Sequence, residues 1–437
     1  MSKENLFQNV ADILEGKLDG QHIEVRGWLH HIRSSGGILF LQLRDGTAVI
    51  QCTLKKDKVD PTIFEKLATT TIESTIVVSG EVKRDPRAPG GYEIRADKVG
   101  VVYPAEEGYP IAKKYHGPDF LMDYRHFWIR NEKMQATIRL RSRLLEEARR
   151  WLMDHGYLEV QVPILVNAAV EGGSTLFPVK YFDQDAYLSQ SWQLYAEAMI
   201  ASVGKIFTVA PSFRAEKSRT RRHLTEYWHL EVEAPWLELD GLMQLEEELV
   251  THMCARTAKA MPEKLKLLGQ DPDKIANLKP PFPKITYTQA VEKVRKKMPE
   301  FEWGKDLGYE EEKVLTEDFD SPFFVSRYPK GVKAFYHMPD PQDPRVTLSV
   351  DLLAPEGYGE ITGGGQRIHS IDQLLARITE EHLNPDDYKW YTELRRFGTV
   401  PHSGFGMGVE RVVAWVCGLE HIRDAIPFPR LINRIYP

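Results

Sequence analysis

The chain has little cysteine and no long apolar run, and each shortage excludes a class of protein. Its three cysteines, Cys52, Cys254 and Cys417, stand far apart and form no CxxC pair. They support neither a disulfide framework nor a cysteine zinc site, and a reducing compartment fits best. No apolar stretch reaches the roughly 18 residues of a membrane helix, and the N-terminal segment has no hydrophobic signal core. We expect a cytoplasmic protein that neither spans a membrane nor is secreted.

An excess of positive charge is also missing. The sequence holds 57 Lys and Arg against 63 Asp and Glu, a net charge of −6 over 437 residues. That balance argues against a protein that coats DNA, so we expect no DNA partner, but it leaves room for a local basic site. The sequence shows no internal repeat or low-complexity tract. Its length predicts two or three globular domains with a large core.

The N-terminal part contains five β-rich runs separated by turn residues: 22–33, 38–44, 47–54, 75–83 and 92–102. Between the third and the fourth, DPTIFEKLATT predicts a short helix, with Asp60 before its start and Pro61 in its first turn. The order βββαββ is typical of a five-stranded OB-fold β-barrel, which we assign to residues 1–103. Such barrels commonly bind single-stranded nucleic acid on one face; another small β-barrel is the alternative.

Residues 104–132, rich in Pro, Gly and charge, are expected to form a hinge before a second domain at 133–437. There, apolar residues at helical spacing predict a helix over 133–155, and a strand pattern, YLEVQVPIL, follows it. Further strands are expected at 205–210, 227–236, 323–327, 347–353 and 358–362, helices at 240–264 and 370–382, and a helical insertion around 238–285. This mixture predicts an α+β domain around a mostly antiparallel sheet.

Two segments of the second domain indicate a phosphorylated ligand. Residues 214–223 crowd six cationic or potentially cationic side chains into one loop between strand-like runs, which suits a polyanion. The segment HSGFGMGVERVVAW is a glycine-rich strand that leads into a helix, with Arg411 at the junction, so a ligand could approach the backbone closely. A solvated run of charges and a tightly packed turn are the respective alternatives.

A third segment, SVDLLAPEGYGEITGGGQRIH, brings two carboxylates onto neighbouring strands. Asp351 and Glu360 could converge on one hard cation, and oxygen ligands of this kind suit Mg²⁺ bound to nucleotide phosphates. A buried structural carboxylate paired with Arg367 is the alternative.

In chain order these segments resemble the three signature motifs of class II aminoacyl-tRNA synthetases, specifically the Asp/Asn/Lys subgroup with an N-terminal anticodon-binding OB domain. Motif 1 resembles the helix ending in YLEVQVPIL, motif 2 is FRAEKSRTRRHLTEYWHLEVE, and motif 3 is GFGMGVERVVAW. The resemblance covers nearly the whole chain. It implies an antiparallel-sheet catalytic domain, an ATP-dependent ligase that uses ATP and Mg²⁺, a tRNA substrate, and a homodimer formed through motif 1.

The resemblance also indicates which amino acid the enzyme would activate. Aspartate-specific members carry QSxQLxK, whose lysine neutralises the substrate carboxylate, whereas this chain has QSWQLYAE with Ala196 at that position. Without that lysine, Glu231 would accept a hydrogen bond from the NH₂ of an asparagine side chain while Arg367 donates to its carbonyl oxygen. Mismatched buried groups give discrimination of about 10⁴ without editing. We expect L-asparagine and tRNA(Asn) as substrates, and we expect the unusual Trp192 and His229 not to touch the discriminating pair.

Position by position, the resemblance implies that Arg214 binds the substrate α-carboxylate and the α-phosphate of ATP, that Tyr227 and Arg411 enclose the adenine, and that Phe40 stacks a middle anticodon base. For Phe40, a core aromatic is the alternative. The expected residues are Arg214, Arg411 and Glu360 for catalysis; Arg214, Glu216, Arg222, His223, Tyr227 and Arg411 for ATP; Glu171, Gln193, Glu231 and Arg367 for the amino acid; Asp351 and Glu360 for the metal; and Arg33, Phe40, Gln51 and Glu93 for the anticodon.

Other functions stay open from the sequence. An aspartate-specific or relaxed Asp/Asn enzyme is disfavoured by Ala196 together with Glu231. An enzyme that makes asparagine on the same catalytic domain would have no use for an anticodon barrel. A non-catalytic tRNA-binding paralogue is disfavoured by the intact Arg214, Glu360 and Arg411.

Overall fold

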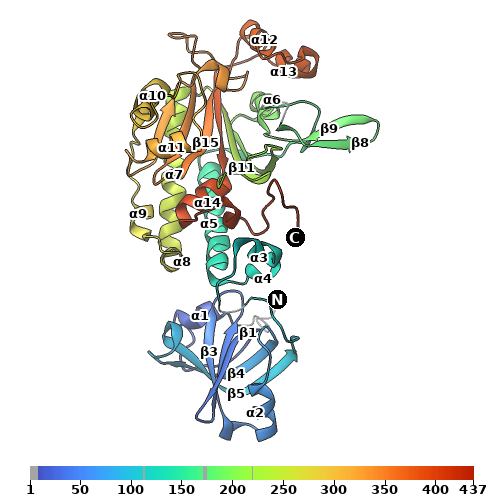
Figure 1. Cartoon of the computed structure of the whole chain (residues 1–437), viewed down its shortest axis with the longest axis vertical. Helices are drawn as coiled ribbons and strands as arrows, with labels where there is room; N and C mark the ends of the chain where they lie inside the picture. The colour runs from blue at the N-terminus through green and yellow to red at the C-terminus, as the bar shows by residue number, and fades with distance from the viewer. Residues whose placement is uncertain (1–7, 112–113, 171–174, 219) are drawn as a thin grey trace. The chain divides into compact units, whose positions relative to one another are not determined.

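The computed structural model describes residues 8–111, 114–170, 175–218 and 220–437. The chain forms two compact units, Met1–Tyr115 and His116–Pro437 (Figure 1). Within the described ranges, no helix is both long and apolar enough to cross a membrane.

The first unit is a closed five-stranded barrel with the strand order β1-β2-β3-β5-β4. Its interior is filled by alternate residues of each strand, such as Leu39 and Leu41, and the side chain of Asp60 caps the connecting helix by accepting from the Thr62 N–H at 2.8 Å. The predicted βββαββ order is therefore confirmed. The elements are α1 (Val10–Leu14), β1 (His22–Ser35), β2 (Ile38–Arg44), β3 (Val49–Lys55), α2 (Pro61–Ala68), β4 (Thr75–Arg84) and β5 (Tyr92–Tyr103).

The second unit is built on an eight-stranded sheet with the order β12-β13-β14-β15-β16-β11-β10-β6. All neighbouring strands are antiparallel except the pairs β12–β13 and β10–β6, so the expected mostly antiparallel sheet is confirmed. The strands are β6 (Leu158–Glu159), β10 (Ile206–Phe213), β11 (Glu226–Pro235), β12 (Lys284–Thr286), β13 (Phe323–Ser326), β14 (Ser349–Ala354), β15 (Gly359–Gln366) and β16 (His402–Gly408).

Three helices share the main core with this sheet: α5 (Glu132–Asp154), α7 (Leu239–Ala260) and α14 (Val409–Cys417). On α5 the buried residues Leu140, Leu144, Ala148 and Leu152 recur every four positions, so one stripe of the helix faces the core. The segment expected as a helical insertion begins with α7, whose apolar face lies in that same core. The other helices that follow α5 in the described chain are α6 (Gln193–Val203), α8 (Pro262–Leu267), α9 (Pro272–Ala276), α10 (Tyr287–Arg295), α11 (Tyr309–Thr316), α12 (Ile371–Glu380) and α13 (Lys389–Glu393).

Two local expectations are wrong. The pattern YLEVQVPIL yields only the two-residue strand β6, and the chain then enters a small sheet of β7 (Leu165–Val166), β8 (Pro178–Tyr181) and β9 (Gln184–Leu188), whose hairpin extends away from the main sheet (Figure 1). The expected hinge contains two short helices, α3 (Pro118–Asp123) and α4 (Arg125–Trp128). Arg125 is 1% exposed, and its guanidinium donates to the carbonyl oxygens of Arg423, Ile426 and Pro427. These contacts fix the segment to the second unit.

Candidate functional site

Two adjoining cavities lie on the second unit, one of about 570 Å³ and one of about 390 Å³. Strands β11, β15 and β16 contribute to both. Arg214, His229, Glu360 and Gly406 line both cavities, so they mark the boundary between them. A ligand that occupied both cavities would pass these four residues.

The larger cavity contains the side chains expected to bind ATP. It is lined by Arg214, Glu216, Arg222, His223, Tyr227 and Arg411. The Arg214 guanidinium lies 5.6 Å from the centre of the Tyr227 ring. A Cβ atom at Gly406 would lie only 2.5 Å from His229 Nε2, which explains why the strand β16 needs a small residue there.

Two members of the cationic loop, Arg222 and His223, lie close to acids, whereas Lys217 and Arg221 are exposed and Arg219 lies outside the described residues. Arg222 Nη1 lies 2.6 Å from Glu312 Oε2, and this glutamate was not anticipated. The Nδ1 atom of His223 forms a hydrogen bond with Ser218 Oγ at 3.0 Å. Its Nε2 atom lies 3.7 Å from Glu216 Oε2. Burial and the nearby Arg411 lower the pKa of His223, so its ring is neutral at pH 7.

The two carboxylates expected to bind a metal converge at Gly363. A Cβ atom there would lie 3.1 Å from Glu360 Oε1 and 3.2 Å from Asp351 Oδ1. Their partners are Arg411, whose Nη1 lies 2.8 Å from Glu360 Oε2, and Lys333, whose Nζ lies 2.8 Å from both Asp351 oxygens. The alternative pairing with Arg367 is wrong for these acids.

The electrostatics of the two carboxylates differ. Burial raises the pKa of Asp351 to about 7; Lys333 opposes this shift and the charge of Glu360 adds to it. Burial would also raise the pKa of Glu360, but Arg411 and Lys333 outweigh it and hold that pKa at about 2. One carboxylate is therefore ionised at neutral pH and the other is close to its midpoint, where a cation would favour the ionised form.

These residues fit a magnesium site of the kind completed by a nucleotide. Within the described ranges no group of three or more His, Cys, Asp or Glu converges as a metal site. Mg²⁺ commonly takes only one or two protein carboxylates and completes its shell with waters and substrate phosphates. A bound cation would share Asp351 with Lys333.

The smaller cavity contains Glu231, which is 4% exposed. Its carboxylate accepts a short hydrogen bond from Ser191 Oγ and a second from the Trp192 N–H at 3.2 Å, and His229 Nδ1 lies 3.5 Å away. The expectation that Trp192 and His229 stay clear of the discriminating pair is therefore wrong. Burial, with Arg214 nearby, lowers the pKa of His229 to about 3, so this neighbour of Glu231 is neutral at pH 7.

Ala196, at the position that carries lysine in aspartate-specific relatives, is not among the residues that line either cavity. Ala196 is fully buried in a small apolar cluster with Trp192, Ile200 and Ile206. The helix α6 thus presents no cation to the cavity from this position.

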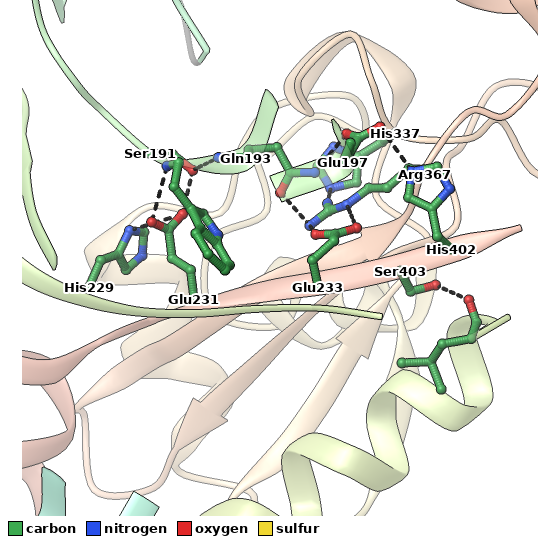
Figure 2. A network of polar contacts seen from close by, with 12 residues as sticks. Ser191, Gln193, Glu197, His229, Glu231, Glu233, His337, Arg367, His402 and Ser403 are labelled. Carbon is green, nitrogen blue, oxygen red and sulfur yellow. Dashed lines mark hydrogen bonds and ion pairs between the residues drawn. The ribbon is translucent and has the colours of Figure 1, made fainter. Parts of the chain in front are cut away.

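Arg367 and Gln193 line the same cavity and contact each other (Figure 2). Arg367 forms a two-point ion pair with Glu233, with Nε at 3.2 Å from Oε1 and Nη2 at 3.0 Å from Oε2, and Nη2 also donates to Gln193 Oε1 at 2.7 Å. Its Nη1 lies 3.3 Å from His337 Nε2. Arg367 is therefore held by Glu233 rather than by Glu231. Glu171, the remaining residue expected to bind the amino acid, lies outside the described residues.

Several residues of the site carried no usable sequence signal. Lys333 lies in a loop outside every motif. Glu312 lies far along the sequence from Arg222, the arginine that it contacts. Glu233 had one available signal: it follows Glu231 by two positions on β11, so both side chains project from the same face of the sheet.

In the barrel, the four expected anticodon residues form two neighbouring pairs. Arg33 opposes Phe40 across β1 and β2 with its guanidinium 4.4 Å from the ring centre, and Gln51 opposes Glu93 across β3 and β5 with Nε2 at 3.3 Å from Oε2. Phe40 is half-buried on the outer face, between the interior positions Leu39 and Leu41. The core-aromatic alternative is therefore wrong.

Comparison with known proteins identifies the family. The model of class II tRNA synthetases (D, K and N) matches residues 117–432, and that of the OB-fold nucleic acid binding domain matches residues 23–102. The chain belongs to the class II tRNA synthetases of the D, K and N group.

Within this group, the matching relatives include asparagine–tRNA ligases. That of Symbiobacterium thermophilum is 49% identical over 96% of this chain and 97% of its own length, and that of Pyrococcus horikoshii is 50% identical over 96% and 97%. The crystal structure of the P. horikoshii asparaginyl-tRNA synthetase complexed with asparaginyl-adenylate matches with a TM-score of 0.95 at 49% identity, covering 100% of both chains. The aspartyl-tRNA synthetase from Entamoeba histolytica has the same fold, with a TM-score of 0.86, but is only 26% identical.

Proposed function

We propose that the chain joins L-asparagine to tRNA(Asn) in two steps. Asparagine and ATP first give asparaginyl-adenylate and pyrophosphate, and asparagine is then transferred to the 3′-terminal adenosine of the tRNA. As a class II synthetase it is an ATP-dependent ligase. The observation that carries the proposal is the pair of adjoining cavities with Arg214 at their boundary and the carboxylate of Glu231 in the smaller one.

In this proposal ATP occupies the larger cavity. Tyr227 and Arg411 enclose the adenine, Glu216 meets its edge or the tRNA end, and Arg222 and His223 reach the outer phosphates. Arg222 reaches the phosphates while Glu312 holds its Nη1. Neutral His223 contributes a hydrogen bond and not a full charge. An arginine suits a phosphate because its planar fork offers two parallel donors.

Activation needs no general base because the attacking α-carboxylate is already ionised. One carboxylate oxygen forms a bond to the α-phosphorus, the bond from that phosphorus to the bridging oxygen breaks, and pyrophosphate leaves with the electron pair. Arg214 binds both the carboxylate and the α-phosphate, so it aligns nucleophile and electrophile and stabilises the added negative charge. In the second step a ribose hydroxyl attacks the acyl carbon and AMP leaves.

Asp351 and Glu360 would hold Mg²⁺ together with the phosphates. The cation would neutralise charge on ATP and favour departure of pyrophosphate. Arg411 keeps Glu360 ionised for this task.

Selection of the amide rests on Glu231. Its carboxylate accepts from the asparagine NH₂ and repels the carboxylate of aspartate, since no lysine stands at Ala196 to offset two negative charges. Arg367 Nη1 carries two protons, so beside its contact with His337 it can donate one to the amide oxygen while Nε and Nη2 bind Glu233 and Gln193. The runner-up, an aspartyl or relaxed enzyme, is disfavoured by Ala196, which stands where aspartate-specific relatives carry lysine. Ser191, the Trp192 N–H and the neutral ring of His229 are among the groups that contact the Glu231 carboxylate.

Two further partners, the tRNA anticodon and a second copy of the chain, are proposed from exposed surfaces, one on each unit. The outer barrel face with Arg33, Phe40, Gln51 and Glu93 would read the anticodon. Exposed apolar residues along the motif 1 segment, Leu158, Ile164 and Leu165 at 51%, 41% and 42% exposure, support a homodimer formed there. We also place the protein in the cytoplasm.

Amino-acid-dependent exchange of pyrophosphate into ATP tests the function directly. Purified protein with ATP and magnesium should catalyse exchange with asparagine and at least about 10³-fold less efficiently with aspartate or lysine. Exchange with aspartate alone would leave the fold intact and refute the role of Glu231. No exchange with asparagine, aspartate or lysine would instead favour a non-catalytic tRNA-binding paralogue.

A further inference from the structure

Behind Gln193 lies a buried polar cluster centred on Glu197, which the reaction as described does not use (Figure 2). Glu197 follows Gln193 by four positions on α6, so the two side chains share one face of the helix. Its side chain is 1% exposed, and it does not line the cavity, whereas Gln193 does. Any effect of Glu197 on the substrate must therefore pass through its neighbours.

Four polar groups face the two oxygens of this carboxylate. Oε1 accepts from Gln193 Nε2 at 2.8 Å and from the Tyr391 hydroxyl at 2.7 Å. Oε2 accepts a short hydrogen bond from Arg395 Nη2 and lies 2.9 Å from His402 Nε2. Burial alone would raise the pKa of Glu197, but Arg395 and His402 hold it well below its usual range, so the group is an ionised acceptor.

These contacts leave one orientation for the amide of Gln193. Arg367 can only donate, so it requires the amide oxygen at 2.7 Å from its Nη2, and ionised Glu197 can only accept, so it requires the amide nitrogen. A half-turn of the amide would set donor against donor and acceptor against acceptor. The chemistry of the two neighbours thus fixes which amide atom meets the ligand.

We propose that Glu197 is a positioning residue for asparagine: it holds the Gln193 amide so that Oε1 is presented to the substrate α-ammonium group. This rests on the proposed function, in which Gln193 binds that group. An ammonium group has only donors, and Oε1 keeps a second lone pair after accepting from Arg367. Glu197 therefore contributes to binding of the amino acid and not to binding of ATP.

Replacement of Glu197 by glutamine tests this because it keeps the shape and removes one acceptor oxygen. Arg395 can only donate, so the remaining side-chain oxygen of Gln at position 197 must face Arg395 and the new NH₂ must take the place of Oε1. The NH₂ then faces Tyr391, whose hydroxyl can turn to accept, and Gln193, whose amide must rotate. Rotation brings Gln193 Nε2 against Arg367 and the substrate ammonium group.

The measurement is asparagine-dependent pyrophosphate exchange by the full-length protein, with KM for asparagine and for ATP determined separately. Glu197→Gln should raise KM for asparagine about 10-fold or more and leave KM for ATP within about twofold. Tyr391→Phe is the matched control, since it removes another donor to the same carboxylate and keeps the bond to Gln193. It should lower the melting temperature without a comparable rise in KM for asparagine.

A swapped pair gives the sharpest outcome. In the double variant Gln193→Glu with Glu197→Gln, the new carboxylate at 193 accepts from Arg367, from the ammonium group and from the NH₂ at 197. KM for asparagine should return to within about fivefold of the wild-type value. If Glu197→Gln fails to fold, Glu197→Asp, which withdraws both oxygens from Gln193, provides the same KM comparison.

Three results would overturn the positioning role: an unchanged KM for asparagine in Glu197→Gln, a parallel rise in KM for ATP, or no recovery in the swapped pair. These failures differ from a failure of the proposed function. In that case the wild-type protein itself would show no exchange with asparagine.

Discussion

At the scale of single residues, the site depends on charges held in place by opposite charges. Arg411 is paired with Glu360, Lys333 with Asp351 and Arg222 with Glu312. Arg222 and Arg411 line the larger cavity and Lys333 lines the smaller one, and the acidic partner of each fixes its side chain without a ligand present. Such preorganised charge stabilises a transition state without a further cost of reorientation.

Arg214 is the residue whose loss should matter most for activation. In the proposed function Arg214 binds the carboxylate and the α-phosphate together, so Arg214→Ala should lower asparagine-dependent pyrophosphate exchange by about 10³-fold or more. Arg221→Ala is a matched control, because Arg221 is an exposed arginine of the same loop that lines neither of the two cavities. An Arg214→Ala enzyme within about tenfold of the wild type would refute the assigned role.

At the scale of elements, alternation and helical spacing were sufficient to predict the barrel, helix α5 and the junction of β16 with α14. These elements each bury one regular face, so the sequence pattern carries their structure. The segment after α5 was overpredicted, because its apolar residues Leu158, Ile164 and Leu165 remain exposed at the surface and do not pair along one strand. Apolar alternation alone does not distinguish a sheet strand from an exposed contact surface.

Partners in the site were predictable only where a motif supplied them. Glu197 and Arg395 are 198 positions apart, and Arg367 and Glu233 are 134 positions apart, yet both pairs are in hydrogen-bond contact. No local pattern in the sequence indicates such contacts, since they depend on how α6, β11 and the segment after β15 pack. The expected site residues of the second unit that the structure describes do line the cavities, whereas buried charges such as Glu197, Glu233 and Glu312 that hold some of them were not predicted.

The barrel face provides a prediction about tRNA. Phe40→Ala should weaken binding of tRNA(Asn) by about 5- to 100-fold, the range expected for one lost base–aromatic stack. Exchange of pyrophosphate with asparagine should not change, because it does not require tRNA. Tyr103→Ala is the control: this β5 residue is an aromatic at 71% exposure in the same unit. Equal tRNA affinity in Phe40→Ala and the wild type would remove Phe40 from the anticodon site.

At the scale of the whole molecule, the second unit encloses an acid that stability measurements can detect. Glu246 of α7 is fully buried and contacts Thr362 of β15. Burial raises its pKa to about 8, although the hydrogen bond from Thr362 opposes the shift. The folded protein therefore binds the proton of Glu246 more tightly than the unfolded chain does. The resulting stabilisation is complete at pH values below the pKa of Glu246 in the unfolded chain, and it is lost as the pH rises towards about 8.

Glu246→Gln should remove this dependence. The melting temperature of the variant should rise relative to the wild type between pH 5 and pH 8, with a slope in free energy of unfolding approaching about 1.4 kcal/mol per pH unit. Glu248→Gln, a substitution on the same helix at a position with an exposed hydrogen-bond partner, serves as the control. If the difference in melting temperature between Glu246→Gln and the wild type stayed constant with pH, Glu246 could not be a neutral buried acid.

The cavities of the second unit bring together cationic groups, among them Arg214, Arg222 and Arg411, and Glu231, the carboxylate that we propose distinguishes asparagine from the nearly isosteric aspartate. The most direct measurement is the ratio of kcat/KM for asparagine to that for aspartate in pyrophosphate exchange, compared between the wild type and Glu231→Gln. We predict a wild-type ratio of about 10⁴ that falls at least about 30-fold in the variant, because the charge that repels aspartate is gone. An unchanged ratio would contradict selection of the amide by Glu231.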